Sequence, residues 1–429
     1  MTPADTSVRA LMPASALPLA YYLTAHAGFA GALATLIVDP ALPGASFYHP
    51  RFVALVHLLT LAWITGSILG SLYVVAPLAL RIPMVVRRTD WTAFVAFVAG
   101  VVGMVGHFWI GTYDGMAWSA ALVLLPIVRA GWLLARGRHQ SNAPPAVLLH
   151  VALAFFNILA AAALGILIGV NRTRGFVTLS PLAAMYAHAH LAAIGWAAML
   201  VIGLSYRLIP MMLPAAMPTG RLLAVSAILL ESGLALIFVT LLTNSAWTVL
   251  GALLIVTGFA SFVVQLRSAL KHKLPRPPAL PKRDWSTWQT HAAFFWLLVT
   301  LALGLVLSTD AGGDSRLRLM WIYGVAGLVG FLGQIIPGIA GRLFPLYAWY
   351  RAFAKKGAPP DRSAHELPTP RFALPIFVVW ALGVPSLTYG LAMSSAPLIA
   401  LGAALLLAAV LLGGAYLLHM LRRPDPSSS

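Results

Sequence analysis

The sequence predicts an all-α integral membrane protein whose twelve transmembrane helices form three four-helix arcs with pseudo-threefold symmetry. Three observations predict this fold: apolar stretches of membrane-spanning length, a one-sided distribution of Lys and Arg, and an internal repeat. Of the 429 residues, 60% are hydrophobic and 9% are charged, whereas soluble domains carry about 25% charged residues. The composition therefore excludes an ordinary soluble domain.

The predicted helices follow from the length of each apolar stretch. A helix needs roughly 20 apolar residues to cross the hydrocarbon of a bilayer. The spans are expected at 17–37, 52–80, 91–112, 116–136, 146–170, 181–213, 221–243, 246–268, 287–308, 317–348, 372–393 and 396–421. The chain has no cysteine, which excludes disulfides, thiolate nucleophiles and iron–sulfur clusters. We expect a multi-pass protein of a bacterial inner membrane, with the lipid bilayer as its first partner.

The net charge of +17 is a topology signal and not a nucleic-acid site. With a cytoplasmic N-terminus, 23 of the 28 Lys and Arg residues fall on one side of the predicted spans. Only five fall on the other side: Arg51, Arg172, Arg174, Arg316 and Arg318. Such a bias orients short loops towards the cytoplasm during insertion. Both termini are therefore expected in the cytoplasm, and no nucleic-acid partner is expected.

An internal repeat divides the chain into units at about 17–142, 143–283 and 284–423. "HLLTLAWITGSILGSLYVVAP" in the second span aligns without gaps with "HLAAIGWAAMLVIGLSYRLIP" in the sixth. The matched pairs are His57 with His190, Trp63 with Trp196, Gly70 with Gly203, Tyr73 with Tyr206 and Pro77 with Pro210. The tenth span keeps this pattern, but Val325 replaces the histidine. His26, His150 and His291 are expected at one shared position of the first, fifth and ninth spans.

Histidines in the second and sixth spans are the main candidate ligands. A helix turns about 100° per residue, so His188 and His190 point about 200° apart and cannot bind one metal from a regular helix. Unpaired polar groups are costly in hydrocarbon, and intramembrane ionisable residues are functional candidates. One interpretation is that these histidines only bond to neighbouring helices. The other is that two histidines on facing helices bind one haem iron.

The equivalence of His57 and His190 favours haem, although histidine spacing alone does not choose haem over copper or zinc. Glycines at Gly66 and Gly203 would let a flat macrocycle approach the backbone, and Trp63 and Trp196 would pack against its edge. Glycine and aromatic residues are also common in ordinary helix packing.

The stretch "AHAHLAAIGWAAMLVIGLSYRLIP" resembles the tenth-helix motif of the catalytic subunit I of heme–copper oxidases, especially the cbb-type oxidases and nitric oxide reductases. "HPRFVALVHLLTLAW" is similar to the second helix of that subunit. The resemblance implies a low-spin b-type haem on His57 and His190 and a second, high-spin haem on His188. The NnrS-like membrane proteins of nitric-oxide stress are a further comparison. The copper ligand set of the family is not apparent here, because no His-His pair occurs; His107 is the remaining metal candidate.

The sequence thus predicts a haem protein with a bis-histidine b-type haem near the periplasmic face. Its expected function is electron transfer or the handling of nitric oxide or oxygen. An alternative is an active nitric oxide or oxygen reductase, an oxidoreductase with a second haem on His188. Another is a membrane transporter with structural histidines, for which Pro337 is the one supporting feature. Expected partners are an electron donor, quinol or cytochrome c, or a partner subunit.

One acidic residue belongs to these hypotheses. Glu231 lies mid-membrane in "ILLESGLALIF". A charge there is costly, so Glu231 is either a proton relay or a structural hydrogen-bonding group.

Overall fold

The computed structural model describes residues 11–44, 46–178, 180–276, 284–309 and 315–423. Within them, twelve helices are long and apolar enough to cross a membrane. These spans are Leu17–Val38, Pro50–Ala79, Arg88–Ile110, Met116–Gln140, Pro145–Arg174, Pro181–Met212, Leu223–Thr243, Thr248–Lys271, Trp285–Leu307, Arg316–Lys356, Pro370–Ala392 and Ala396–Arg422. The twelve predicted spans are confirmed, and the chain is a multi-pass membrane protein.

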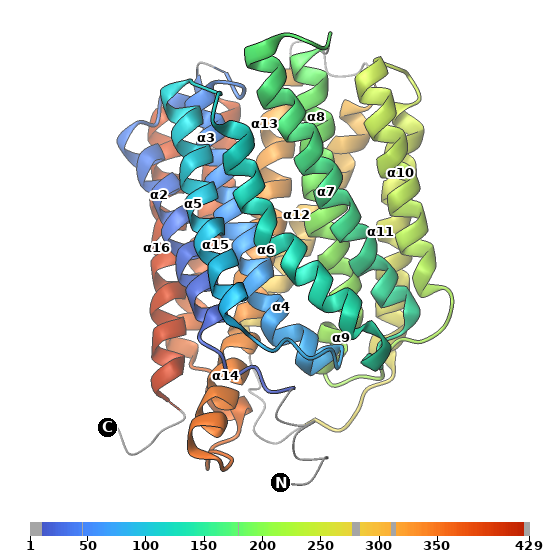
Figure 1. Ribbon diagram of the computed structural model, residues 1–429, viewed down its shortest axis with the longest axis vertical. Helices are drawn as coiled ribbons and strands as arrows, with labels where there is room; N and C mark the ends of the chain where they lie inside the picture. The colour runs from blue at the N-terminus through green and yellow to red at the C-terminus, as the bar shows by residue number, and fades with distance from the viewer. Residues whose placement is uncertain (1–10, 45, 179, 277–283, 310–314, 424–429) are drawn as a thin grey trace. The chain divides into compact units, whose positions relative to one another are not determined.

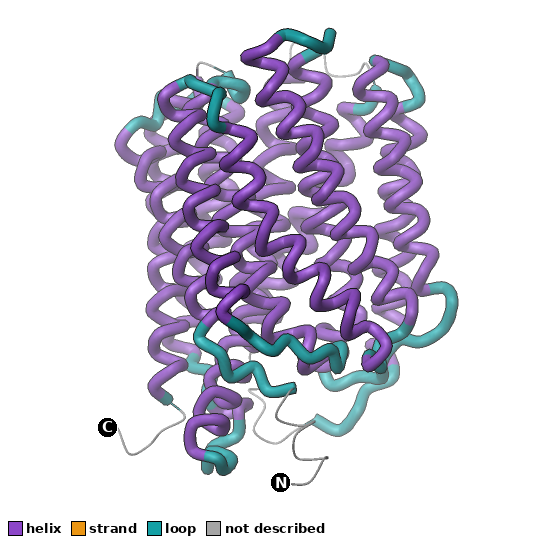
Figure 2. Tube along the Cα trace, viewed as in Figure 1, coloured by secondary structure: helices purple, strands orange, loops and turns teal. Residues whose placement is uncertain are grey.

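Nine spans are built on a single α-helix. They are α2 (Leu17–Val38), α5 (Arg88–Ile110), α6 (Met116–Gly137), α7 (Pro145–Arg174), α10 (Leu223–Thr243), α11 (Thr248–Lys271), α12 (Trp285–Leu307), α15 (Pro370–Ala392) and α16 (Ala396–Arg422). Short 3₁₀ turns occur at η1 (Leu42–Gly44), η3 (Arg138–Gln140) and η7 (Ala364–Glu366). Figure 2 shows the described chain as helices joined by loops, and its one β-type pairing is an isolated bridge between Ala215 and Lys273.

The other three spans each contain a π-helical segment between two α-helices. The second span is α3 (Pro50–His57), η2 (Leu58–Thr65) and α4 (Gly66–Ala79). The sixth is α8 (Pro181–His190), η4 (Leu191–Ala198) and α9 (Met199–Met212). The tenth is α13 (Arg316–Val325), η6 (Ala326–Gly333) and α14 (Gln334–Lys356). Each π-helix has eight residues, a rare length because π turns usually occur singly and often at functional sites.

These three π-helices occupy the same place in the internal alignment. Each begins one residue after an aligned position, namely after His57, His190 and Val325. The alignment was made on residue identity alone, yet the unusual backbone begins at the same column in all three spans. Hydropathy did not predict this backbone.

Helix ends follow familiar residue preferences. Prolines occupy the first positions of α3, α7, α8 and α15, where the missing N–H would have no intrahelical partner. The Ser180 hydroxyl accepts a bond from the Ala183 amide at the start of α8. Gly175 ends α7 with φ 62°, a left-handed conformation that favours glycine.

The chain divides into two compact units. Unit 1 comprises the described residues of 1–94, 277–300 and 317–429, and unit 2 those of 95–276 and 301–316. Within unit 1, α2 packs against α4, η2 and α16, and α16 pairs with α15 (Figure 1). Within unit 2, α10 pairs with α11, and α7 contacts α6, α8, η4, α9 and α10. The boundaries of the units differ from those of the predicted repeats, because unit 2 contains residues 143–276 of the second repeat together with residues 95–142 of the first.

Glycines allow the closest helix contacts. A Cβ atom at Gly233 in α10 would lie 2.8 Å from the Gly251 carbonyl oxygen of α11. Small residues of this kind let transmembrane helices approach backbone to backbone. Large apolar side chains such as Val102, Phe156 and Leu382 are more than half exposed, as expected for positions that face lipid.

Candidate functional site

His57 and His190 have the same local setting in their separate units. The His57 Nδ1 lies 2.8 Å from the Val53 carbonyl oxygen, and the His190 Nδ1 lies 2.8 Å from that of Tyr186. In both cases the acceptor is four residues earlier in the same helix, and the next residue begins a π-helix. Because a carbonyl only accepts hydrogen bonds, a neutral imidazole in this position carries its proton on Nδ1. Its Nε2 then carries the lone pair that a metal ligand uses.

His188 bonds across to another helix. Its Nδ1 lies 2.8 Å from the Ala161 carbonyl oxygen of α7, so its Nε2 also carries the lone pair when the ring is neutral. The ring lies against Gly165, where a Cβ atom would be 2.9 Å from the His188 Cε1. His188 and His190 therefore bond to different helices from neighbouring positions of α8.

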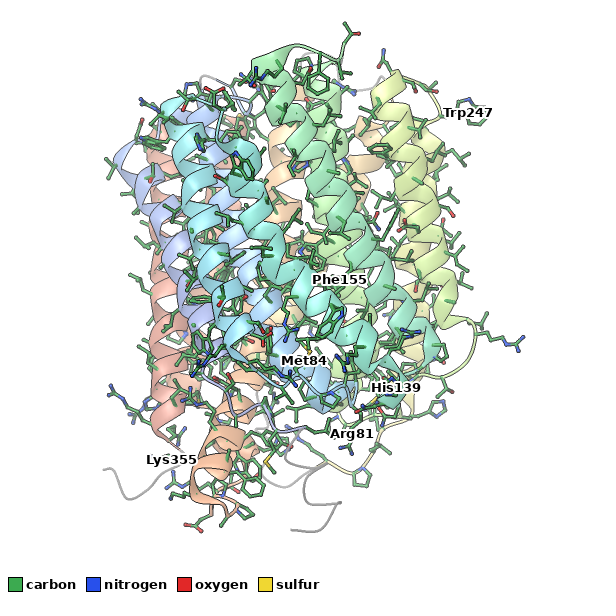
Figure 3. The ribbon with its side chains drawn as sticks, in the orientation of Figure 1. Arg81, Met84, His139, Phe155, Trp247 and Lys355 are labelled. Atoms are coloured by element: carbon green, nitrogen blue, oxygen red, sulfur yellow. The ribbon has the colours of Figure 1, made fainter. Side chains whose placement is uncertain are left out.

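The predicted aromatic residues are buried in helix contacts. Trp63 donates its Nε1–H to the Gly333 carbonyl at 3.2 Å, inside unit 1. Trp196 meets the ring edge of Phe155 with centroids 5.1 Å apart, and Figure 3 shows Phe155 on α7. Trp63 is 2% exposed and Trp196 is 1% exposed. These contacts describe helix packing for both residues.

The two predicted glycines are also buried. A Cβ atom at Gly203 would lie 2.5 Å from the His150 Cβ and 3.6 Å from the Val147 carbonyl oxygen. Gly203 thus brings α9 against α7. Gly66 is the buried first residue of α4.

His107 lies against the turn that joins α5 to α6. Its Nδ1 is 3.1 Å from the Thr112 carbonyl oxygen, and its Nε2 lies against Gly115. The ring is therefore packed against this turn. No group of three or more His, Cys, Asp or Glu side chains with metal-binding geometry occurs in the described part of the chain.

Glu231 of α10 is paired with a buried amide. The Asn157 Nδ2 donates to the Glu231 Oε2 at 2.7 Å, and Asn157 is 1% exposed. A Cβ atom at Gly195 in η4 would lie 2.5 Å from the Asn157 Cβ. The amide is therefore held between η4 and α10, and it points at the carboxyl group.

A second polar group lies on the same face of α7. The His150 Nδ1 lies 2.7 Å from the Ala146 carbonyl oxygen, so its Nε2 accepts from the Ser226 hydroxyl at 2.9 Å. The Tyr206 hydroxyl lies 3.0 Å from the Ser226 Oγ. His150, Asn157 and the Ala161 carbonyl are separated by seven and four residues, which are rises of about 10 Å and 6 Å on one face of an α-helix. Unit 2 thus contains a column of polar groups that ends at His188.

The histidines expected at one shared position do not share it. Gly70 and Gly203 are equivalent in the internal alignment. A Cβ atom added at Gly70 would lie nearest to the Tyr21 Cβ, and one added at Gly203 nearest to the His150 Cβ. Tyr21 and His150 are therefore the equivalent residues of the first and fifth spans. His26 lies five residues beyond Tyr21. His150 is fully buried, His26 is 9% exposed and His291 is exposed. The prediction of a common position for these three residues is wrong, because a single histidine carries too little information to fix the register of a helix.

Sequence reasoning missed several buried polar residues. Asp90, at the start of α5, is fully buried and accepts bonds from the Tyr73 hydroxyl at 2.9 Å and the Arg87 amide at 2.7 Å. Gln289 is buried, and its side-chain amide has no hydrogen-bond partner among the described residues. It stands alone in an apolar stretch, so only its position near the start of a span could have drawn attention to it.

No protein-family model matches the chain, and no curated protein matches it significantly.

Proposed function

We propose that this is a haem-binding protein of a bacterial inner membrane, in which His57 and His190 are the axial ligands of a b-type haem near the periplasmic face. The observation that carries the proposal is the identical setting of the two histidines. Each holds its Nδ1 against the carbonyl four residues earlier, and each ends an α-helix directly before a π-helix. His26 and His150 also bond to the carbonyl four residues earlier, so the π-helix that follows directly is the feature that sets His57 and His190 apart from them.

The donor set fits a haem iron. A bond from Nδ1 to a backbone carbonyl fixes the tautomer and ring orientation of a ligating histidine and raises its basicity. Both imidazoles are only partly buried although they lie within membrane spans. A haem bound by two histidines supplies one-electron redox chemistry at a potential set by its ligands and their hydrogen bonds. The proposed role is electron transfer or the handling of nitric oxide or oxygen.

A second candidate function is an oxidoreductase acting on nitric oxide or oxygen, with a second haem on His188. The Ala161 carbonyl that orients His188 supports it. The Asn157–Glu231 pair lies one turn away along α7, where Glu231 would relay protons. Copper is left out of the proposal, because His107 lies against its own turn and no further histidines join it in the described residues.

The proposal includes three four-helix arcs with pseudo-threefold symmetry and cytoplasmic termini. The equivalent places of η2, η4 and η6 support the repeat, and the one-sided Lys and Arg residues support the orientation. A transporter with structural histidines is the remaining alternative. Its one supporting residue, Pro337, lies inside the continuous helix α14.

A reduced-minus-oxidised optical spectrum of the purified protein, recorded with and without carbon monoxide, tests the proposal. We expect a b-type spectrum that is lost in His57→Ala and in His190→Ala but kept in His291→Ala, the exposed control. A carbon-monoxide shift that only His188→Ala removes would establish the second haem. Absence of haem after supplementation would overturn the proposal and favour the transporter.

A further inference from the structure

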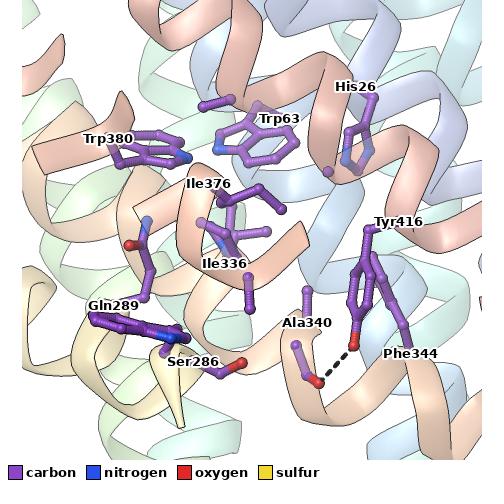
Figure 4. Close-up of a pocket in the computed structure, with 16 residues that line it drawn as sticks. His26, Trp63, Ser286, Gln289, Ile336, Ala340, Phe344, Ile376, Trp380 and Tyr416 are labelled. Carbon is purple, nitrogen blue, oxygen red and sulfur yellow. Dashed lines mark hydrogen bonds between the residues drawn. The ribbon is translucent and has the colours of Figure 1, made fainter. Parts of the chain in front are cut away.

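Unit 1 contains a pocket that the haem proposal does not use. It lies among α2, η2, α12, α14, α15 and α16, and Figure 4 shows the side chains that line it. His26, Trp63, Trp380 and Tyr416 stand around it, with Gln289 reaching in from α12. Its walls are mostly apolar and include several aromatic rings, and its few polar groups come from α2, α12 and α16.

The Gln289 amide indicates a ligand. Gln289 is 2% exposed, and neither its Oε1 nor its Nε2 has a hydrogen-bond partner in the described residues. Leaving a buried polar group unsatisfied is costly, whereas an apolar group of the same shape would cost nothing. The side chain lines the pocket, so a molecule in the pocket can satisfy it. That molecule must offer a hydrogen-bond acceptor, a donor, or both.

His26 supplies a second polar contact on another wall. Its Nδ1 lies 2.7 Å from the Tyr22 carbonyl oxygen, so a neutral ring presents Nε2 as an acceptor. The His26 ring stands edge-on to Trp63, with centroids 5.0 Å apart and planes at 85°. The His26 Nε2 can accept one hydrogen bond, and the Gln289 amide can both donate and accept. A ring that carries a hydroxyl group at one position and a hydroxyl or carbonyl group at another can bond to both side chains.

The pocket also lies where a lipid-soluble ring would arrive. Gln289 is the fifth residue of α12, and Tyr416 lies six residues before the last residue of α16. Both positions are within about 9 Å of a helix end at 1.5 Å per residue, and therefore near one boundary of the hydrocarbon. Small residues bring the helices close together here, because Gly341 packs against Ser286 and a Cβ atom at Gly413 would lie 3.1 Å from the His26 Nε2.

We propose that this pocket binds the head group of a quinol or quinone. Trp63, Trp285 and Trp380 offer faces for the ring. The His26 Nε2 accepts a hydrogen bond from a hydroxyl group of the quinol, and the Gln289 amide donates to the other oxygen of the quinol or to a carbonyl oxygen of the quinone. The space open to water-sized molecules is about 30 Å³, room for roughly two or three waters. The ring therefore displaces water and moves Ile336 and Ile376, which lie across the pocket in Figure 4. Binding stands on the pocket alone, and the role of the quinol as electron donor rests on the proposed haem function.

Quenching of tryptophan fluorescence by a short-chain ubiquinone, titrated into the detergent-purified protein, tests the proposal. We expect saturable quenching in the unaltered protein. Gln289→Leu should weaken binding about tenfold without loss of folding, because it removes an unsatisfied amide. Gln265→Leu is the matched control, because this glutamine lies in α11 and bonds to Ser261. Ile376→Val should tighten binding a few-fold by enlarging the pocket.

The result that overturns the proposal is quenching that does not saturate, or a Gln289→Leu protein that binds as tightly as the unaltered one. Either outcome would leave a water-filled cavity only. The titration is repeated on His57→Ala protein, whose optical spectrum reports the haem. Quinone binding that survives there while the haem is lost separates the two proposals. A b-type spectrum in the unaltered protein without saturable quinone binding refutes the pocket alone.

Discussion

Replacing Gly203 with alanine should force α9 away from α7. The new Cβ would lie 2.5 Å from the His150 Cβ and 3.6 Å from the Val147 carbonyl oxygen. Ordinary van der Waals contacts begin at 3.4 Å, so the two helices must separate by about 1 Å. A gap of that size removes a quarter to a half of the attraction between two packed atoms. The first contact is with a Cβ atom fixed to the backbone, so a rotamer change in His150 cannot relieve it.

The cost can be estimated against a matched control. Overpacking a well-packed contact costs about 1–3 kcal/mol, and alanine gains about 1 kcal/mol over glycine within a helix. Gly31→Ala in α2 should show only the stabilisation of the helix by alanine, because a Cβ atom there meets nothing within 4 Å. The free energy of unfolding of Gly203→Ala should therefore be about 1–3 kcal/mol lower than that of Gly31→Ala.

The assay is thermal denaturation of detergent-purified protein at one fixed heating rate, followed by size-exclusion chromatography of the soluble fraction. A fixed rate is needed because unfolding of such proteins is often irreversible. Gly203→Ala should lose its folded fraction at a clearly lower temperature than Gly31→Ala. Equal denaturation temperatures would refute the close packing of α9 on α7.

Three further predictions concern single contacts. Asn157→Leu removes the donor that lies 2.7 Å from Glu231 and should lower the free energy of unfolding by about 1–3 kcal/mol. The double variant with Glu231→Leu should recover much of that stability. A double variant that recovers none would show that the pair does not interact. Trp63→Phe loses the 3.2 Å bond that the indole donates and should cost about 1 kcal/mol, whereas Trp247→Phe at an exposed position should change the denaturation temperature little. Burial, with the charge of a nearby arginine, lowers the pKa of His365. As the pH falls through the usual histidine range, the unfolded chain takes up a proton that the folded loop resists, so stability decreases. His365→Gln should remove that part of the pH dependence in limited proteolysis of the loop, and an unchanged pH profile would contradict it.

The membrane spans were predictable because their signal is additive. Each apolar residue contributes to the mean hydropathy of a stretch, so errors at single positions do not matter. The end of a span is less certain. The tenth was predicted to end at residue 348 but continues as helix to Lys356, because polar residues beyond the membrane can extend a helix without adding to its hydropathy.

The π-helices and the pocket were not predictable in this way. Over eight mostly apolar residues, α and π geometry bury the same residue types, so the pattern does not distinguish them. The pocket is built from residues of six elements, and its polar residues His26 and Gln289 come from two of them. Each looks like an isolated polar residue in its own helix, and only the packing of α2 and α12 within unit 1 shows that both face one space.

The π-helical segments also determine how three spans respond to a change in chain length. In a regular α-helix, removing one residue rotates everything after it by about 100°. A π turn holds more residues than an α turn, so removing one residue between 58 and 65 lets the backbone relax towards α-helical geometry, and this relaxation absorbs most of the rotation. Gly70 would then still pack against Tyr21, whereas the same deletion between residues 66 and 69, in α4, would turn Gly70 away from it.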